Sequence, residues 1–131
     1  MKIRADRLNG GNLEAQAFVV DFPFSFISDF DAQTGCLVAE NHPLDGHSMA
    51  GKVLVCPEGR GGTMGPFILY EAMRRGNAPA AIFCDKIDPV LYEAAITIDI
   101  PFFSGFSGSI VQQVKNGQHV AIRDDDIQIS A

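Results

Sequence analysis

A glycine-rich segment, Gly59-Arg60-Gly61-Gly62-Thr63, carries the backbone and side chains best suited to hold a ligand. Glycine lets the backbone approach a ligand closely and adopt positive φ angles. Arg60 adds a planar fork of N–H donors that matches a carboxylate or a phosphate, and Thr63 adds a hydroxyl. These residues predict a binding site for a small anion, in which Arg60, Gly61 and Gly62 contact the ligand.

Two elements are expected to position this segment. Residues 51–56 are mostly apolar and stop at Pro57, which is typical of a buried strand. Residues 66–75 favour a helix that begins with proline and stops at Gly76. The start of that helix exposes unpaired N–H groups and a partial positive charge, which favour an anion. The alternative is a plain strand-to-helix turn, in which Thr63 only caps the helix.

Other kinds of site lack a matching motif. The phosphate-binding pattern GxxxxGK[ST] is absent, and the dinucleotide fingerprint GxGxxG does not match here. No GxSxG motif of a serine hydrolase occurs. His42, His47 and His119 lack the spacing of metal ligands, so no metal site is predicted in this chain.

Length and composition indicate one soluble domain, residues 1–131. A net charge of −6 argues against a nucleic-acid partner, which needs a basic face. No secretory signal opens the sequence, and no apolar run approaches the ~20 residues that span a bilayer. We therefore expect a cytoplasmic protein without a membrane partner. Cys36, Cys56 and Cys84 lie in or beside strand-like runs, which favours buried structural thiols over cluster ligands.

The remaining sequence predicts strands near both ends and strand–helix units between them. Residues 13–20 alternate like a half-buried strand, and the preceding Asn-Gly-Gly suggests a hairpin. A buried strand is expected at residues 80–84, then a helix from Asp88 through about Ala94, then a strand at 95–98.

Further along, Ser107 is expected to cap a helix that Asn116-Gly117 ends, and a hairpin pairs residues 119–122 with 127–129. This order favours a mixed α/β barrel or a layered fold. The stretch 22–30 contains four phenylalanines, which either pack in the core or face a partner.

Several short motifs, taken in order, resemble the small subunits of the aconitase X family, also described as aconitase X swivel domains. Each motif alone is weak, but the order and spacing are specific, and they extend through roughly residues 10–123. The matching stretches are Phe24-Ser25-Phe26, Asp31-Ala32-Gln33-Thr34-Gly35, residues 42–55, Gly59-Arg60-Gly61 and Ala78-Pro79-Ala80-Ala81-Ile82.

This resemblance implies a swivelling β/β/α, barrel-like single domain. It also implies association with a larger catalytic subunit that carries an iron–sulfur cluster or iron, with no cofactor in this chain. Members of the family are hydro-lyases that act on small anionic substrates. The activities implied are dehydration of mevalonate 5-phosphate or of cis-3-hydroxy-L-proline.

The glycine-rich segment departs from the family pattern at one position. The family usually has Gly-Arg-Gly-Ser-Ser, and its first serine is taken as the group that abstracts a proton. This chain has Gly62 and Thr63 there, so the resemblance leaves Thr63 as the candidate catalytic base. Two alternatives stay open: a catalytically silent regulatory or scaffold subunit, and a stand-alone module that binds small anions.

Overall fold

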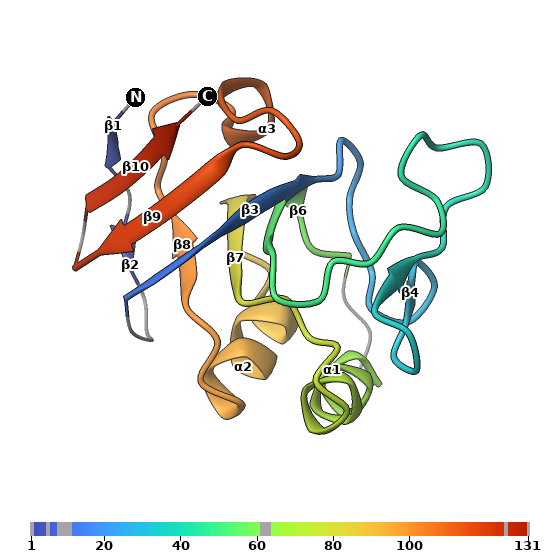
Figure 1. Ribbon diagram of the computed structural model, residues 1–131. Coiled ribbons are helices and arrows are strands. Elements are labelled where there is room, and N and C mark those ends of the chain that lie inside the picture. The colour runs from blue at the N-terminus through green and yellow to red at the C-terminus, as the bar shows by residue number, and fades with distance from the viewer. Residues whose placement is uncertain (1, 5, 8–11, 61–63, 125, 131) are drawn as a thin grey trace.

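The computed structural model describes residues 2–4, 6–7, 12–60, 64–124 and 126–130 (Figure 1). Its strands are β1 (Lys2–Arg4), β2 (Asp6–Arg7), β3 (Leu13–Val19), β4 (Phe30–Asp31), β5 (Cys36–Leu37), β6 (Val53–Glu58), β7 (Ala81–Lys86), β8 (Phe102–Ser104), β9 (His119–Arg123) and β10 (Asp126–Ser130). Its helices are α1 (Gly65–Arg74), α2 (Pro89–Thr97) and α3 (Ile110–Gln113).

Most of these strands form one mixed sheet, in the order β1-β10-β9-β3-β6-β7-β8-β2, while β4 pairs with β5 separately. The central strands β3, β6, β7 and β8 are parallel. The flanking strands β9, β10 and β1 add antiparallel on one side, and β2 adds antiparallel on the other. The mixed α/β class that we predicted is confirmed.

Side chains of the central strands alternate between two hydrophobic cores, one on each face of the sheet. Leu54 and Ile82 belong to the core that also contains residues of α1 and α2. Val53 and Phe83 belong to the other core, together with Ile110 of α3. Because both faces are covered, β6 and β7 can be apolar along most of their length.

The phenylalanine-rich stretch packs into the first of these cores. Phe24, Phe26 and Phe30 are buried, and their rings meet edge to face, with centroids 4.9 and 5.0 Å apart. Such pairs add to the stability that burial alone provides. The core-packing interpretation of this stretch is therefore confirmed for these rings, while Ile27 in the same stretch stays 44% exposed.

The second helix is longer than we predicted, and the strand expected at residues 95–98 is wrong. Leu91, Ala94 and Ala95 are buried at helical spacing, so α2 continues through Thr97. Asp99 then adopts a positive φ of 58° and ends the helical path. The strand that follows is β8, a short element that the local pattern did not reveal.

Two other local expectations concern the chain before β3 and the start of α3. The turn of the hairpin expected before residue 13 lies outside the described residues; within them, β2 pairs with β8, while β3 pairs with β9 and β6. The helix expected after Ser107 begins only at Ile110. Its start is held by Asp85, whose Oδ1 accepts the Ile110 N–H at 2.7 Å, while Ser109 Oγ donates to Oδ2 at 3.0 Å. The terminal hairpin is confirmed as β9 and β10.

The two edges of the sheet are formed by β1 and β2, which are successive segments of the chain. Arg4 and Asp6 are only two Cα steps apart, so the edges approach each other within about 8 Å. In the described residues no ladder joins β1 to β2, so the closed barrel that we expected is not shown. None of the helices described here has the length and apolar character needed to cross a membrane.

Candidate functional site

The glycine-rich segment lies between β6 and α1, as the sequence predicted. β6 runs through Pro57 to Glu58, slightly beyond its predicted end. Gly61, Gly62 and Thr63 lie outside the described residues, so their roles in binding and catalysis stay predictions. Arg60, the remaining predicted site residue, is described in full.

The backbone on either side of Arg60 is tied to the phenylalanine-rich stretch. The Phe24 N–H donates to the Glu58 carbonyl at 2.9 Å, and the Arg60 N–H donates to the Phe24 carbonyl at 2.7 Å. Gly59 between them lies close to the start of α2. A Cβ added at Gly59 would come within 2.8 Å of a Leu91 methyl group and 3.0 Å of the Asp88 Cβ. Glycine is therefore required here for packing.

The Arg60 side chain is held by a turn formed by residues 25–29. Its Nη2 donates to Asp29 Oδ2 at 3.2 Å and to Ser28 Oγ at 2.9 Å. The same Asp29 oxygen accepts the Ser25 N–H at 2.9 Å, and the Asp29 N–H donates back to the Ser25 carbonyl. The Asp29 side chain is 13% exposed, while that of Arg60 is 60% exposed. The turn thus fixes the guanidinium and leaves it accessible to an anion.

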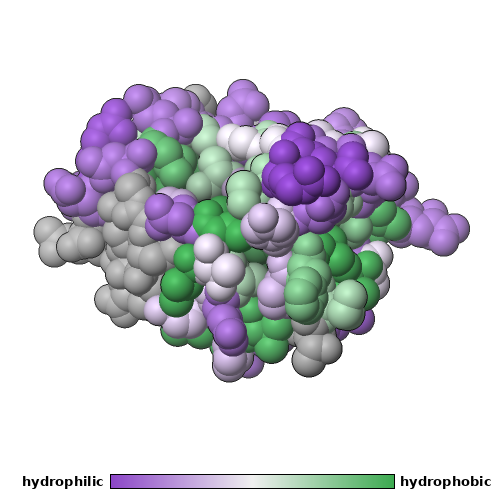
Figure 2. All heavy atoms as spheres, turned by 90° about the horizontal axis from the view of Figure 1, so that it is seen from below, coloured by the Kyte–Doolittle hydropathy of each residue, from purple (hydrophilic) through white to green (hydrophobic). Residues whose placement is uncertain are grey.

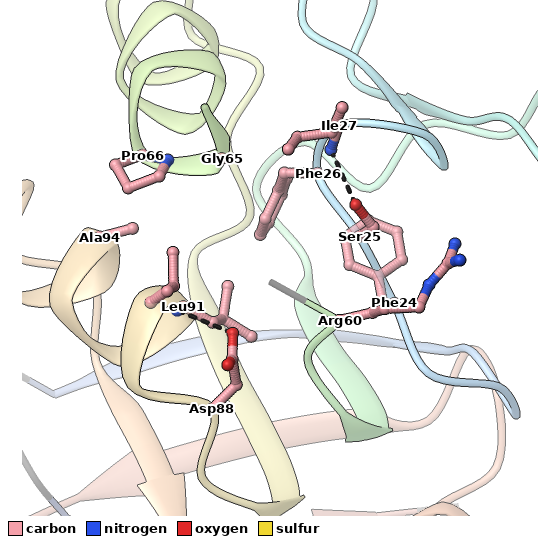
Figure 3. A pocket seen from close by; sticks show the side chains of 11 residues that line it. Phe24, Ser25, Phe26, Ile27, Arg60, Gly65, Pro66, Asp88, Leu91 and Ala94 are labelled. Carbon is pink, nitrogen blue, oxygen red and sulfur yellow. Dashed lines mark hydrogen bonds between the residues drawn. The ribbon is translucent and has the colours of Figure 1, made fainter. Parts of the chain in front are cut away.

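A shallow, open pocket lies beside Arg60 (Figure 3). It is bounded by residues of the phenylalanine-rich stretch, by the first turn of α1 and by the first turns of α2. Figure 3 shows the Arg60 side chain extending away from Asp88 and Leu91, toward the turn that contains Ser25. The pocket walls are mainly apolar: Phe24, Phe26, Ile27, Pro66, Val90, Leu91 and Ala94. The arrangement therefore combines an apolar hollow with a cation at its border.

The two helices at this pocket begin differently. Asp88 is the N-cap of α2, and its Oδ2 accepts the Leu91 N–H at 3.0 Å. The N-cap of α1 is Met64, which provides no side-chain hydrogen bond. Thr63 lies outside the described residues, so the alternative in which it caps the helix stays open. N–H groups in the first turn of a helix favour an anion, so α1 lies where the sequence predicted a positive helix end.

Two cysteines lie in β6 and β7, shortly before these strands end near the pocket. Cys56 of β6 and Cys84 of β7 are opposite each other in register, fully buried, with their sulfur atoms 3.2 Å apart. The hydrogen bond with Cys84 and burial raise the pKa of the Cys56 thiol well above its usual value. The buried structural interpretation is confirmed for these two thiols, whereas Cys36 is partly exposed. In the described part of the chain, no cluster of three or more His, Cys, Asp or Glu side chains suits a metal ion.

Sequence reasoning missed Asp29 as the partner of Arg60. The two residues are 31 positions apart, and a carboxylate at the start of a loop is ordinary. The local pattern around Asp29 therefore carries no sign of this contact. The link becomes visible only once Phe24 is seen to pair with the segment that follows β6.

The chain was compared with known proteins. Residues 2–131 match the model of the aconitase X swivel domain. The "Phosphomevalonate dehydratase small subunit" of Thermococcus gammatolerans is 33% identical, over 98% of this chain and 96% of that protein. The protein of the same name from Methanothrix thermoacetophila is 38% identical, over 93% of this chain and 88% of that protein.

A solved structure agrees with these sequence matches. The crystal structure of Thermococcus kodakaraensis aconitase X in its holo-form superposes with a TM-score of 0.90 at 29% identity. The superposition covers 100% of this chain and 99% of that chain. The resemblance seen in scattered short motifs thus extends along nearly the whole chain.

Proposed function

The chain belongs to the aconitase X swivel-domain family, and from this premise we propose that it is the small subunit of a hydro-lyase that dehydrates mevalonate 5-phosphate. Relatives named as small subunits of phosphomevalonate dehydratase, matched along 88% or more of their length, support this choice of substrate. The structural observation that carries the proposal is Arg60, an exposed guanidinium held in place beside a pocket.

Arg60 is suited to hold an anionic group of the substrate. A guanidinium binds phosphate or carboxylate through parallel N–H bonds, which orients the anion as well as attracting it. Asp29 and Ser28 use only Nη2 for their bonds to this side chain. Because the side chain is already fixed, little rotational freedom is lost when the substrate binds.

Dehydration removes a carbon-bound proton and expels hydroxide. We propose that Thr63 takes the proton, since it brings the hydroxyl that follows Arg60 in the sequence. A nearby guanidinium and the N–H groups at the start of α1 favour the deprotonated form of such a hydroxyl. A Lewis-acidic iron centre would accept the leaving hydroxide. Because the described residues contain no group of three or more His, Cys, Asp or Glu side chains that could hold a metal ion, we assign that centre to a larger partner subunit.

The test is an assay of the reconstituted complex. This chain is produced together with the larger dehydratase subunit of the same organism, without oxygen, and mevalonate 5-phosphate is added. Mass spectrometry is expected to detect loss of water from the substrate. If cis-3-hydroxy-L-proline is dehydrated instead, the substrate assignment is wrong. If neither compound reacts although the complex forms, a silent subunit is the better explanation.

The role of Thr63 has its own test in the same complex. Thr63→Val keeps the shape of the side chain and deletes the hydroxyl. General-base catalysis contributes roughly 10²–10⁴-fold to a rate, so kcat is expected to fall within that range. Thr63→Ser restores the hydroxyl and is expected to retain activity. Full activity in the valine variant would remove Thr63 from the mechanism.

A further inference from the structure

Helix α1 carries large apolar side chains on its outer surface. Phe67 is 68% exposed, the most of any large hydrophobic side chain described, and Met64 and Tyr70 are 55% and 51% exposed. The opposite face of the helix is already packed, because Leu69 and Ala72 are buried in the core. A helix on a solvated surface is usually polar on its outward face, so the outer face of α1 requires another explanation.

The rim of the pocket beside the first turn of α1 also carries an exposed apolar side chain. Ile27, 44% exposed, lines the pocket opposite Pro66 in the first turn of α1. Figure 2 looks onto α1 and α2 from below, and apolar side chains spread across the middle and lower part of this face. We call the set Ile27, Met64, Phe67 and Tyr70 the α1 surface.

The border of the α1 surface is charged. Near the end of α1, Glu71 pairs with Arg74 at 3.0 Å and with Arg75 at 2.8 Å. An apolar centre with a charged, solvated border is the usual anatomy of a protein–protein interface. An aromatic side chain buries about 150–250 Å², so Phe67 and Tyr70 together leave on the order of 250 Å² in water. That is about a third of the ~800 Å² that each partner contributes to a standard interface.

We propose that the α1 surface is where the larger dehydratase subunit docks, an inference that rests on the proposed function. The position of the surface favours this occupant. Met64 directly precedes α1, and Ile27 and Pro66 line the pocket beside Arg60. A subunit seated here therefore closes the candidate site and brings its own groups next to Arg60. Relatives named small subunits have, by that name, a larger partner.

A second copy of this chain fits the surface less well. Each copy carries a net charge of −6, and like charges oppose association. A symmetric dimer would also bring two identical pockets together, and neither copy would supply the metal that the proposed reaction requires. The same set of variants distinguishes docking of the larger subunit from docking of a second copy.

The experiment measures binding of the purified larger subunit to the full chain by isothermal titration calorimetry. Phe67→Asp is expected to raise Kd by about 30-fold, the effect of losing one interface hot spot. Phe67→Leu is expected to stay within about threefold of the wild type, since it keeps a large apolar side chain for burial against the partner. The matched control is Gln112→Asp, which adds the same charge on α3, on the opposite face of the sheet. Circular dichroism and thermal melting verify that each variant is folded.

Several outcomes overturn the proposal. The first is that the wild-type chain forms no complex with the larger subunit. The second is that folded Phe67→Asp binds with a Kd within about twofold of the wild type. The third is that Gln112→Asp loses as much affinity as Phe67→Asp. Sedimentation of the chain alone provides another: a wild-type dimer that Phe67→Asp separates, with binding to the larger subunit unchanged, assigns the surface to a second copy. A complex that forms through the α1 surface but lacks dehydratase activity supports the docking site and rejects the proposed function.

Discussion

Helices α1 and α2 lie side by side, each after a buried parallel strand and each with proline in its first turn, yet they begin in different ways. At α2, the Asp88 carboxylate accepts a backbone N–H of the first turn. At α1, Met64 occupies the corresponding position without a side-chain bond. The start of α2 is thus capped by the chain itself, whereas among the described residues no side-chain bond caps the start of α1, which is the helix end that we propose to face an anion. The contrast separates a structural cap from a candidate binding site within one pocket.

The largest effect that would test this contrast is expected at Arg60. Arg60→Gln keeps a polar side chain of similar reach and removes the positive charge. Loss of a charge-assisted bond to an anion costs about 2–3 kcal/mol, so kcat/KM of the reconstituted enzyme is expected to fall by about 100-fold. Thermal stability should change little because the side chain is exposed. Unchanged kinetics would place the substrate elsewhere.

A smaller effect is expected at Asp29, which positions Arg60 without facing the substrate. Asp29→Asn removes the carboxylate that accepts from Nη2 and leaves the guanidinium less fixed. We expect KM to rise by roughly tenfold with kcat nearly retained, since binding loses preorganisation. Steady-state kinetics at several salt concentrations provide the measurement.

The outcome at Asp29 also distinguishes positioning from folding. If Asp29→Asn lowers the melting temperature and kcat together, then the turn at residues 25–29 acts mainly on the fold. Ser28→Ala is the milder variant in the same turn, because it keeps the Asp29 carboxylate and removes the 2.9 Å bond from Arg60 and a longer one, 3.4 Å, to Asp29 Oδ1. Its KM is expected to lie between those of the wild type and Asp29→Asn.

The smallest effect concerns the cap itself. Asp88→Ala deletes the bond to the Leu91 N–H and is expected to lower the free energy of unfolding by about 1 kcal/mol. Its kcat/KM should remain within about twofold of the wild type, because a cap acts on stability rather than on the transition state. Chemical denaturation and the dehydratase assay are run on the same preparation.

The reciprocal variant is Met64→Asp. Met64 has helical dihedral angles, unlike the extended Asp88, so the new carboxylate acts on α1 mainly through the helix dipole, and stability is expected to rise by about 0.5 kcal/mol. The same negative charge competes with an anionic substrate, and KM is expected to increase. A gain in stability without any change in KM would mean that the start of α1 is not part of the binding site.

Elements with strong local patterns were predicted well from the sequence. The buried strand expected at residues 80–84 is confirmed as β7, whose first four residues are apolar and buried, and the Asp88-Pro89 pair begins a helix as expected. Features that depend on distant residues were not accessible in this way. Asp85 caps α3 across 25 positions, and Asp29 reaches Arg60 across 31. The C-terminal end of α2 was predicted wrongly for another reason. Ala95 and Ile96 fit a strand by their local pattern, but Ala95 is buried together with Leu91 and Ala94 at helical spacing, so the helix continues.

For the candidate site, too, some features could be predicted from the local sequence and others could not. Arg60 was predicted as a site residue from its type and from its place in a glycine-rich segment between a strand and a helix, and this role stays a prediction. The apolar pocket was not foreseen, because its walls come from the stretch 24–27, from α1 and from α2. No periodic pattern reports contacts between three such separate segments. Residues 61–63 fall outside this comparison.

The pairing of β1 with β10 has a consequence for biosynthesis. Lys2 lies opposite Gln128, so β1 leaves the ribosome long before the strand with which it pairs. Translation adds about 5–20 residues per second, and a nascent β1 therefore waits on the order of ten seconds for its partner. The parallel centre of β6 and β7 is already synthesised by then, with an unpaired edge beside it. The duration of this incomplete sheet, rather than the stability of the finished one, determines how long the nascent chain is exposed to aggregation.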